Sequence, residues 1–172
     1  MILYNVLARL LDYPAPELRS HLEEIRDVVA KELEISGEER EVIGEFVAHL
    51  EQTELMDLER EYVQTFDMVP EHSLHLTHHL FGDDRGRGPA LVDLGEHYKG
   101  MGLEAREGEL PDYLPLILEY VSTLEEIEAQ IFLADAAKVL TVIAANLEKA
   151  QSRYAPLLRL VEHRGQRLRM AS

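Results

Sequence analysis

The chain has 172 residues, and this length predicts one domain that buries roughly 70% of the surface of its unfolded form. It contains no cysteine, which excludes disulfides, thiolate zinc sites, iron–sulfur clusters and cysteine nucleophiles. Its 33 acidic and 17 basic residues give a net charge of −16. Such a charge repels a phosphate backbone, so nucleic acid is not an expected partner.

The sequence shows neither a signal peptide nor a membrane-spanning segment. Its first residues carry no basic region, and Arg9 and Asp12 interrupt the apolar stretch that follows, so no signal peptide is indicated. Uninterrupted apolar runs are short, as at 131–134, and none could cross a membrane. We therefore expect a cytoplasmic protein without direct membrane insertion.

Apolar residues recur at helical spacing from the N-terminus onward. Those between Leu3 and Leu11 predict a first helix, which the turn at 12–14 ends. Those between Leu18 and Leu33 step by three or four residues and predict a second helix of about five turns.

Two capping patterns follow. Ser36 and Glu39 have the spacing of a capping box, which predicts the start of a third helix. Thr53 is expected to cap a fourth helix, which carries Tyr62 and Phe66.

The middle of the chain alternates short helices with loops. A short helix is predicted around 74–80, and three glycines and a proline within 82–89 then require a loop. The next helix passes through Tyr98 and ends at a glycine, and the stretch 104–111 is a second loop.

The last third is predicted to be helical again, with helices over 112–122 and 154–168. Between them, Thr123 and Glu126 have the spacing of a capping box that opens a long helix. No stretch shows the period-two alternation of strands. The prediction is therefore an all-α, single-domain helical bundle over 1–172, with a short basic C-terminal tail from about 164.

Several catalytic and cofactor motifs are absent. Gly86-Arg87-Gly88 begins like a dinucleotide fingerprint, but Leu91 replaces the last glycine and no strand precedes it. No phosphate-binding loop sequence occurs. A di-iron bundle needs two Glu-x-x-His pairs, and none of the eight histidines has a carboxylate three residues before it.

The histidines His72, His75, His78 and His79 form a cluster. On one helix, three of these imidazoles could face the same way and hold zinc or nickel, although no carboxylate lies on that stripe. We expect them to be structural, and no metal site is assigned. A histidine-cluster metal-binding protein is kept as the alternative function from another class.

The segment Glu109-Leu110-Pro111-Asp112-Tyr113 is the second informative stretch. Pro111 favours an extended entry, and Asp112 is expected in the first turn of the following helix, where a carboxylate complements the helix dipole. By themselves these residues are explained either by helix capping or by function.

Four blocks together resemble a known family: 62–67, 73–79, 82–94 and 109–112. They resemble the assembly chaperones of molybdenum enzymes, most closely the nitrate reductase delta-subunit (NarJ) type within the wider TorD/DmsD-like family. The resemblance covers about residues 2 to 165. It departs from the wider family's E-x-P-D-H signature at Tyr113, which replaces histidine but can still donate a hydrogen bond.

The resemblance implies an all-helical protein that is not an enzyme and holds no cofactor. Such proteins bind the immature catalytic (alpha) subunit of nitrate reductase, including its N-terminal leader remnant, and promote molybdenum cofactor insertion before membrane attachment. Molybdenum cofactor biosynthesis proteins are a second class of partner. A leader helix with basic and apolar faces would suit an apolar groove with acidic walls.

The resemblance also suggests the residues of a peptide-binding site. Glu109 and Asp112 are expected as acidic contacts and Tyr113 as an amphipathic contact beside them. Tyr62 and Phe66 are expected in the groove or, more in keeping with their spacing, in the core. The family-matching polar residues Asp67, His79 and Arg87 are assigned either to structure or to binding. A chaperone of a dimethyl sulfoxide or trimethylamine oxide reductase is the alternative within the same class.

Overall fold

The computed structural model describes residues 1–82, 84–105 and 107–170, with side chains as far as Arg167. Within these residues the chain forms α-helices, one π-helical segment and one 3-10 segment, and no strand, which confirms the all-α fold class. The elements are α1 (Ile2–Leu11), α2 (Pro16–Ser20), α3 (Leu22–Lys31), α4 (Gly37–Gln52), α5 (Leu55–Tyr62), the π-helical η1 (Val63–Asp67), the 3-10 η2 (Pro70–His72), α6 (Leu76–Phe81), α7 (Arg87–Gly100), α8 (Leu114–Ser122), α9 (Glu126–Lys149) and α10 (Ala155–Met170).

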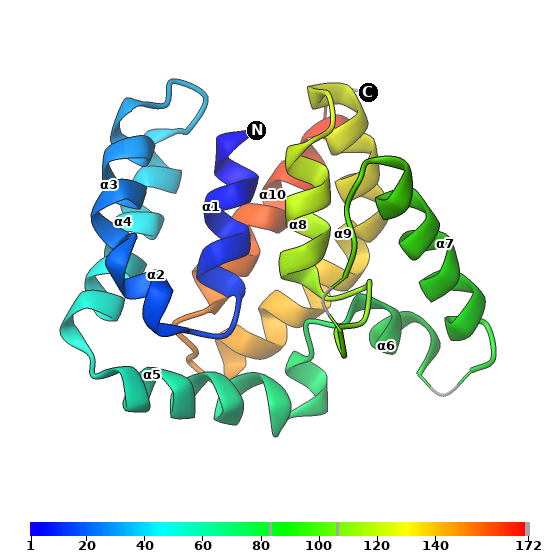
Figure 1. Ribbon diagram of the computed structural model, residues 1–172, viewed down its shortest axis with the longest axis horizontal. Coiled ribbons are helices and arrows are strands. Elements are labelled where there is room, and N and C mark those ends of the chain that lie inside the picture. The colour runs from blue at the N-terminus through cyan, green and yellow to red at the C-terminus, as the bar shows by residue number, and fades with distance from the viewer. Residues whose placement is uncertain (83, 106, 171–172) are drawn as a thin grey trace.

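Helices α1, α8, α9 and α10 form the centre of the bundle. Figure 1 shows α1 beside α8, with α9 and α10 behind them, α5 beneath, and α6 and α7 at one edge. Apolar side chains of all four central helices are buried where they meet, among them Leu7, Leu118, Leu133 and Leu158. Burying a leucine stabilises a fold by about 1.5–3 kcal/mol, so these contacts supply much of the stability.

Helices α9 and α10 pack at very short range. A Cβ atom on Gly165 of α10 would lie 2.6 Å from the carbonyl oxygen of Leu133 in α9. A larger residue at 165 would therefore push the two helices apart.

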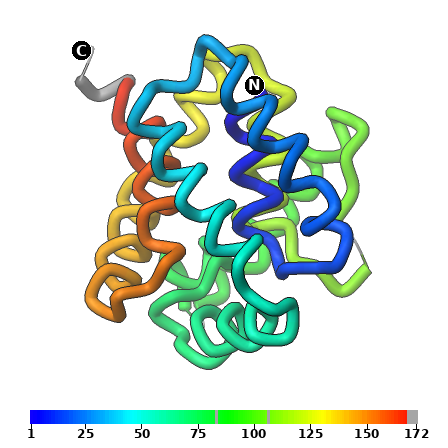
Figure 2. The backbone as a smooth tube through the Cα atoms, turned by 90° about the vertical axis from the view of Figure 1, so that its left-hand side faces the viewer, coloured from blue at the N-terminus to red at the C-terminus, as the bar shows by residue number. Residues whose placement is uncertain are grey.

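Helices α3 and α4 form an outer pair that covers α1, as Figure 2 shows. The capping box at the start of α4 is confirmed: the Ser36 side chain accepts from the Glu39 amide, and the Glu39 side chain accepts from the Ser36 amide.

The predicted second helix differs from the structure, because it is divided at His21 and ends at Lys31. The Ser20 hydroxyl bonds back to the Glu17 carbonyl next to the break. At the far end, Arg40 donates to the carbonyl oxygens of Val29 and Glu32. Leu33 therefore lies beyond the helix and is 94% exposed.

Two predicted N-caps are wrong for one reason. The Thr53 hydroxyl bonds His49 and the Thr123 hydroxyl donates to the Tyr120 carbonyl, so each pairs with the helix before it rather than the helix after it. The N-cap positions of α5 and α9 are instead Glu54 and Glu125.

Two further features bear on function. Within the described residues, no helix has both the length and the apolar composition needed to cross a membrane. The region from 164, predicted as a basic tail, continues α10 as helix to Met170, and Arg164 is buried.

Candidate functional site

Asp112 lies between the second loop and α8, and its side chain is 0% exposed. Its Oδ2 accepts from the backbone amide of Thr77 at 3.0 Å and from the Thr77 hydroxyl at 2.5 Å. Its carboxylate therefore caps the first turn of α6, and not that of α8 as its position in the sequence had suggested. Asp112 was also expected as a direct acidic contact, and this arrangement leaves it no accessible surface for one.

Cationic and ring nitrogens complete the surroundings of Asp112. His75 Nδ1 lies 3.2 Å from Oδ1, and Arg87 Nη2 lies 3.9 Å from Oδ2. Burial by itself raises the pKa of Asp112, but the hydrogen bonds from His75 and Thr77 outweigh it and hold the pKa below its usual value. The ionised carboxylate thus ties the second loop to α6.

Backbone contacts add to this tie. The Leu76 amide donates to the Asp112 carbonyl at 3.2 Å, and the Leu114 amide donates to the Leu74 carbonyl at 2.9 Å. These bonds flank an isolated antiparallel bridge between His75 and Tyr113. The segment 74–76 and the segment 112–114 are therefore held side by side.

Tyr113 connects this region to the end of α1. Its hydroxyl donates to Asp12 Oδ1 at 3.0 Å and lies against the hydroxyl of Tyr62, which donates to the Leu11 carbonyl at 2.8 Å. Burial raises the pKa of both tyrosines, so both keep their protons as donors. The tyrosine at 113 thus orients a carboxylate on another element.

An acidic pocket of about 60 Å³ opens beside Tyr113. The lining combines four carboxylates with one aromatic and two apolar side chains: Asp12, Glu104, Glu109, Glu119, Tyr113, Pro115 and Leu116. We call this the acidic pocket. Its composition suits a cationic side chain with an aliphatic stem, because the carboxylates attract the charge and the apolar residues cover the stem.

A wider, more apolar hollow of about 460 Å³ lies on α5 and η1. It is lined by Tyr13, Met56, Glu59, Arg60, Val63, Gln64 and Met68. Both of its methionines are strongly exposed, Met56 at 72% and Met68 at 69%. We call this the methionine hollow. Flexible, polarisable methionines adapt to the apolar face of a partner.

The two features meet at the turn after α1. Asp12 lines the acidic pocket and the next residue, Tyr13, lines the methionine hollow, while the Tyr13 amide donates to Asp12 Oδ1 at 2.8 Å. The Tyr13 ring also packs edge-on against Tyr62 at 5.6 Å. Acidic and apolar surfaces therefore adjoin.

The remaining predicted residues differ in their exposure to solvent. Tyr62 and Phe66 are buried and their rings pack at 4.7 Å, which confirms that they belong to the core. Asp67 is exposed at the end of η1. Arg87 is half-buried and donates from Nε to the Thr77 hydroxyl at 3.0 Å.

The histidines of the cluster do not share one helix, because η2 ends at His72 and α6, which carries His78 and His79, begins after His75. His72 Nδ1 donates to the Thr65 carbonyl at 2.8 Å, and His79 Nε2 donates to the Ser73 carbonyl at 2.7 Å. Among the residues that the structure describes, no group of three or more histidine or carboxylate side chains could hold a metal ion. The geometry thus does not favour the metal-binding alternative.

Sequence reasoning missed several residues that the structure brings to the site, above all Asp12, Thr77, Met56 and Met68. The sequence signal for Asp12 was its place in a helix-ending turn, where functional residues often lie. The two exposed methionines lie off the apolar stripe that carries Tyr62 and Phe66, and the sequence has no signal that marks an exposed methionine as part of a binding surface.

The sequence was compared with protein-family models and with known proteins. The family model described as "Nitrate reductase delta subunit" matches residues 11–159. The nitrate reductase molybdenum cofactor assembly chaperone NarJ of Escherichia coli (strain K12) is 37% identical over 161 residues, covering 94% of this chain and 68% of the relative. The probable chaperone of the same name in Bacillus subtilis (strain 168) is 32% identical over 164 residues, covering 93% of this chain and 86% of the relative. A third relative, the probable assembly chaperone NarW of Escherichia coli (strain K12), is 30% identical, covering 88% of this chain and 63% of the relative. The chain therefore belongs to the nitrate reductase delta subunit family.

Proposed function

We propose that this protein is an assembly chaperone, without catalytic activity of its own, for the catalytic subunit of a respiratory nitrate reductase. It binds the immature subunit through the N-terminal leader remnant and promotes molybdenum cofactor insertion before the subunit reaches the membrane, which means that it meets its client in the cytoplasm. The names of its relatives support the chaperone role. Binding to the leader rests on the adjoining acidic pocket and methionine hollow.

The two surfaces match the two faces of a basic amphipathic helix. A cationic side chain of the client enters the acidic pocket, where Asp12 is already oriented by Tyr113 and by the Tyr13 amide. The apolar face of the same helix lies over Met56 and Met68 in the methionine hollow. This is helix-in-groove recognition, with a net charge of −16 that steers a basic client toward the protein.

Isothermal titration calorimetry with a synthetic leader peptide tests the proposal. The peptide copies about 15 to 20 residues from the N-terminus of the cognate catalytic subunit, a helix of ~25–30 Å. We expect binding that weakens as salt is raised, because charge contacts at the surface are screened over ~10 Å at 0.1 M. Absence of binding by the folded protein would contradict leader recognition.

Variants separate the two surfaces. Glu109→Gln should weaken binding and reduce its salt dependence, whereas Glu23→Gln, an exposed substitution on α3, should do neither. Met56→Gln with Met68→Gln should weaken binding without changing its salt dependence. The matched control is Met101→Gln, an exposed methionine that lines a different hollow. Equal effects of control and site variants would show that the peptide binds elsewhere.

A further inference from the structure

Helix α7 places one fully buried side chain in the bundle. Across Arg87–Gly100, all of which the structure describes, Tyr98 is the one fully buried side chain, at 1% exposure. Its ring packs against that of Tyr120 in α8, with centroids 5.1 Å apart. Figure 1 shows α7 at the edge of the molecule, on the far side of α8 and α9 from α3 and α4.

The Tyr98 hydroxyl reaches beyond α7 to the second loop. It donates to the carbonyl oxygen of Pro111 at 2.5 Å. Burial raises the pKa of Tyr98, so the hydroxyl keeps the proton that this bond needs. Pro111 directly precedes Asp112, whose carboxylate is fixed on α6.

Tyr98 holds the other end of the same loop through its backbone. The Leu103 amide donates to the Tyr98 carbonyl at 2.8 Å, after Gly102 has turned the chain with a φ of 74°. One residue therefore closes both ends of the loop. The acidic pocket takes two of its carboxylates from this loop, Glu104 and Glu109.

We propose that Tyr98 is a positioning residue for client binding, because its hydroxyl holds the loop so that Glu104 and Glu109 face the client. The inference rests on the proposed function for what the pocket binds. Tyr98 itself makes no contact with the client. Without the hydroxyl, the loop keeps its sequence and charge but samples more conformations, and binding must then order it.

The variant Tyr98→Phe tests this role because it removes the hydroxyl and keeps the buried ring. Affinity for the leader peptide should fall roughly threefold to tenfold, the effect of losing one hydrogen bond. The loss is measured by calorimetry in the wild type and in two further backgrounds, Glu109→Gln and Glu119→Gln. Glu109 lies on the loop, whereas Glu119 lines the same pocket from α8.

A positioning role predicts a coupled result. Tyr98→Phe should weaken binding fully in the wild type and in the Glu119→Gln background, and clearly less in the Glu109→Gln background. Equal losses in all three backgrounds, or no loss in the wild type, would overturn the proposal. Tyr4→Phe is the control, a buried tyrosine of α1 near Arg164 and remote from the loop, and it should leave the affinity unchanged.

Amide hydrogen exchange gives a readout that needs no peptide. The Tyr113 amide donates to the Leu110 carbonyl at 3.2 Å within the held segment, and it should exchange faster in Tyr98→Phe. Amides in the middle of α9 should not change. If the wild type binds no peptide, the proposed function fails, but faster exchange would still support the hold of Tyr98 on the loop. Unchanged exchange at Tyr113 would overturn that hold.

Discussion

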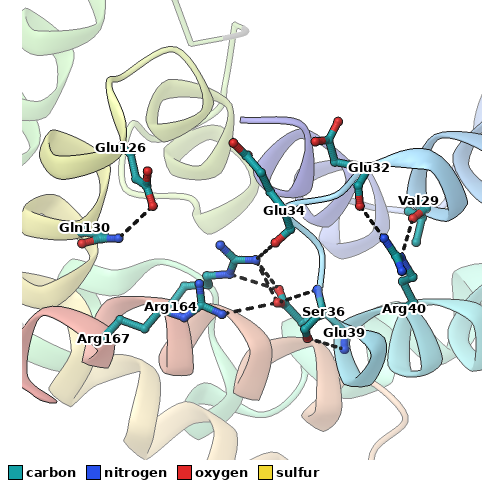
Figure 3. A network of polar contacts seen from close by, with 10 residues as sticks. All are labelled: Val29, Glu32, Glu34, Ser36, Glu39, Arg40, Glu126, Gln130, Arg164 and Arg167. Carbon is teal, nitrogen blue, oxygen red and sulfur yellow. Dashed lines mark hydrogen bonds and ion pairs between the residues drawn. The ribbon is translucent and has the colours of Figure 1, made fainter. Parts of the chain in front are cut away.

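Two buried carboxylates, Glu39 and Asp112, organise opposite sides of this molecule in different ways. Glu39 accepts from Arg164 through Nε at 3.1 Å and Nη2 at 2.8 Å, and Arg167 approaches it at 3.5 Å (Figure 3). Arg164 is 4% exposed and also donates to the Glu34 carbonyl. This cluster joins α10 to the first turn of α4 and to the connection before it, and a buried arginine balances its charge.

Asp112 relies mainly on neutral donors. Thr77 supplies its two shortest hydrogen bonds, while the positive charge comes from Arg87 at 3.9 Å, whose side chain is partly exposed. We call the Glu39 cluster closed, because a buried arginine neutralises its charge, and the Asp112 cluster open, because its charged partners His75 and Arg87 are partly exposed. The difference predicts that the first sets global stability and the second links stability to pH and to client binding.

The largest expected effect comes from breaking the closed cluster. Glu39→Gln leaves the Arg164 charge buried without its carboxylate, which should lower the free energy of unfolding by about 3 kcal/mol or more. Urea unfolding measures the loss. Peptide affinity should be unchanged where the variant is folded, because α4 lines neither the acidic pocket nor the methionine hollow.

The matched control is Arg167→Gln, which removes the half-exposed partner of Glu39 at 3.5 Å. We expect a loss of about 0.5 kcal/mol or less, as for other exposed ion pairs. A comparable loss in both variants would show that Arg164 alone does not balance the charge of Glu39.

The next largest effect should come from Asp112→Asn, about 2 kcal/mol, since the amide removes the negative charge near Arg87 and places an NH₂ group where Oδ1 faces His75, although its oxygen can still accept from Thr77. The folded-state pKa of Asp112 lies below the ordinary 3.8, so its stabilisation is present above that pH and is lost as pH falls through the folded pKa. Thermal unfolding at neutral and acidic pH should therefore show a flatter acid limb in the variant. An unchanged midpoint at neutral pH would contradict the burial of Asp112.

These clusters also show which contacts can be predicted from the sequence and which cannot. Apolar periodicity correctly predicted the central helices, and the capping box at Ser36 was correct because both its partners lie within one turn. The partner of Asp112 was not predictable in this way, since Thr77 lies 35 residues earlier and meets it only through the tertiary fold. For the same reason local patterns did not anticipate the pairing of Arg164 with Glu39.

The sequence motif at 109–113 pointed to part of the candidate site, but the exposed apolar surface beside it was not predicted. Glu109 and Tyr113 line the acidic pocket, and their contact with a peptide there stays a prediction. Helical spacing indicated that Tyr62 and Phe66 belong to the core, but it could not show that the exposed Met56 and Met68 line one hollow beside the acidic pocket. The chain passes from α-helix to π-helix after Tyr62, and that change of period alters which side chains face outward.

A smaller effect should follow from Arg87→Gln in the open cluster. The substitution removes the Nε bond to the Thr77 hydroxyl and the nearest guanidinium from Asp112, at a cost of about 1 kcal/mol in urea unfolding. The cost should be smaller than that of Asp112→Asn, because Thr77 continues to donate to the carboxylate. A loss as large as that of Glu39→Gln would mean that Arg87 neutralises Asp112 as Arg164 neutralises Glu39.

The smallest effect concerns pH near neutrality, through His79 beside the open cluster. Burial is the main cause that lowers the pKa of His79 below its usual 6.5, although the bond to the Ser73 carbonyl opposes the shift. The unfolded chain therefore binds more protons than the folded protein as pH falls through that range, and stability falls with it. His79→Gln keeps a donor for the Ser73 carbonyl but does not titrate. Between about pH 7.5 and about pH 5.5 the variant should lose less free energy of unfolding than the wild type, measured by urea titration.

His21→Gln, at an exposed histidine on the opposite side of the bundle, is the control and should retain the wild-type slope. Identical slopes for wild type and His79→Gln would remove the link between the open cluster and neutral pH.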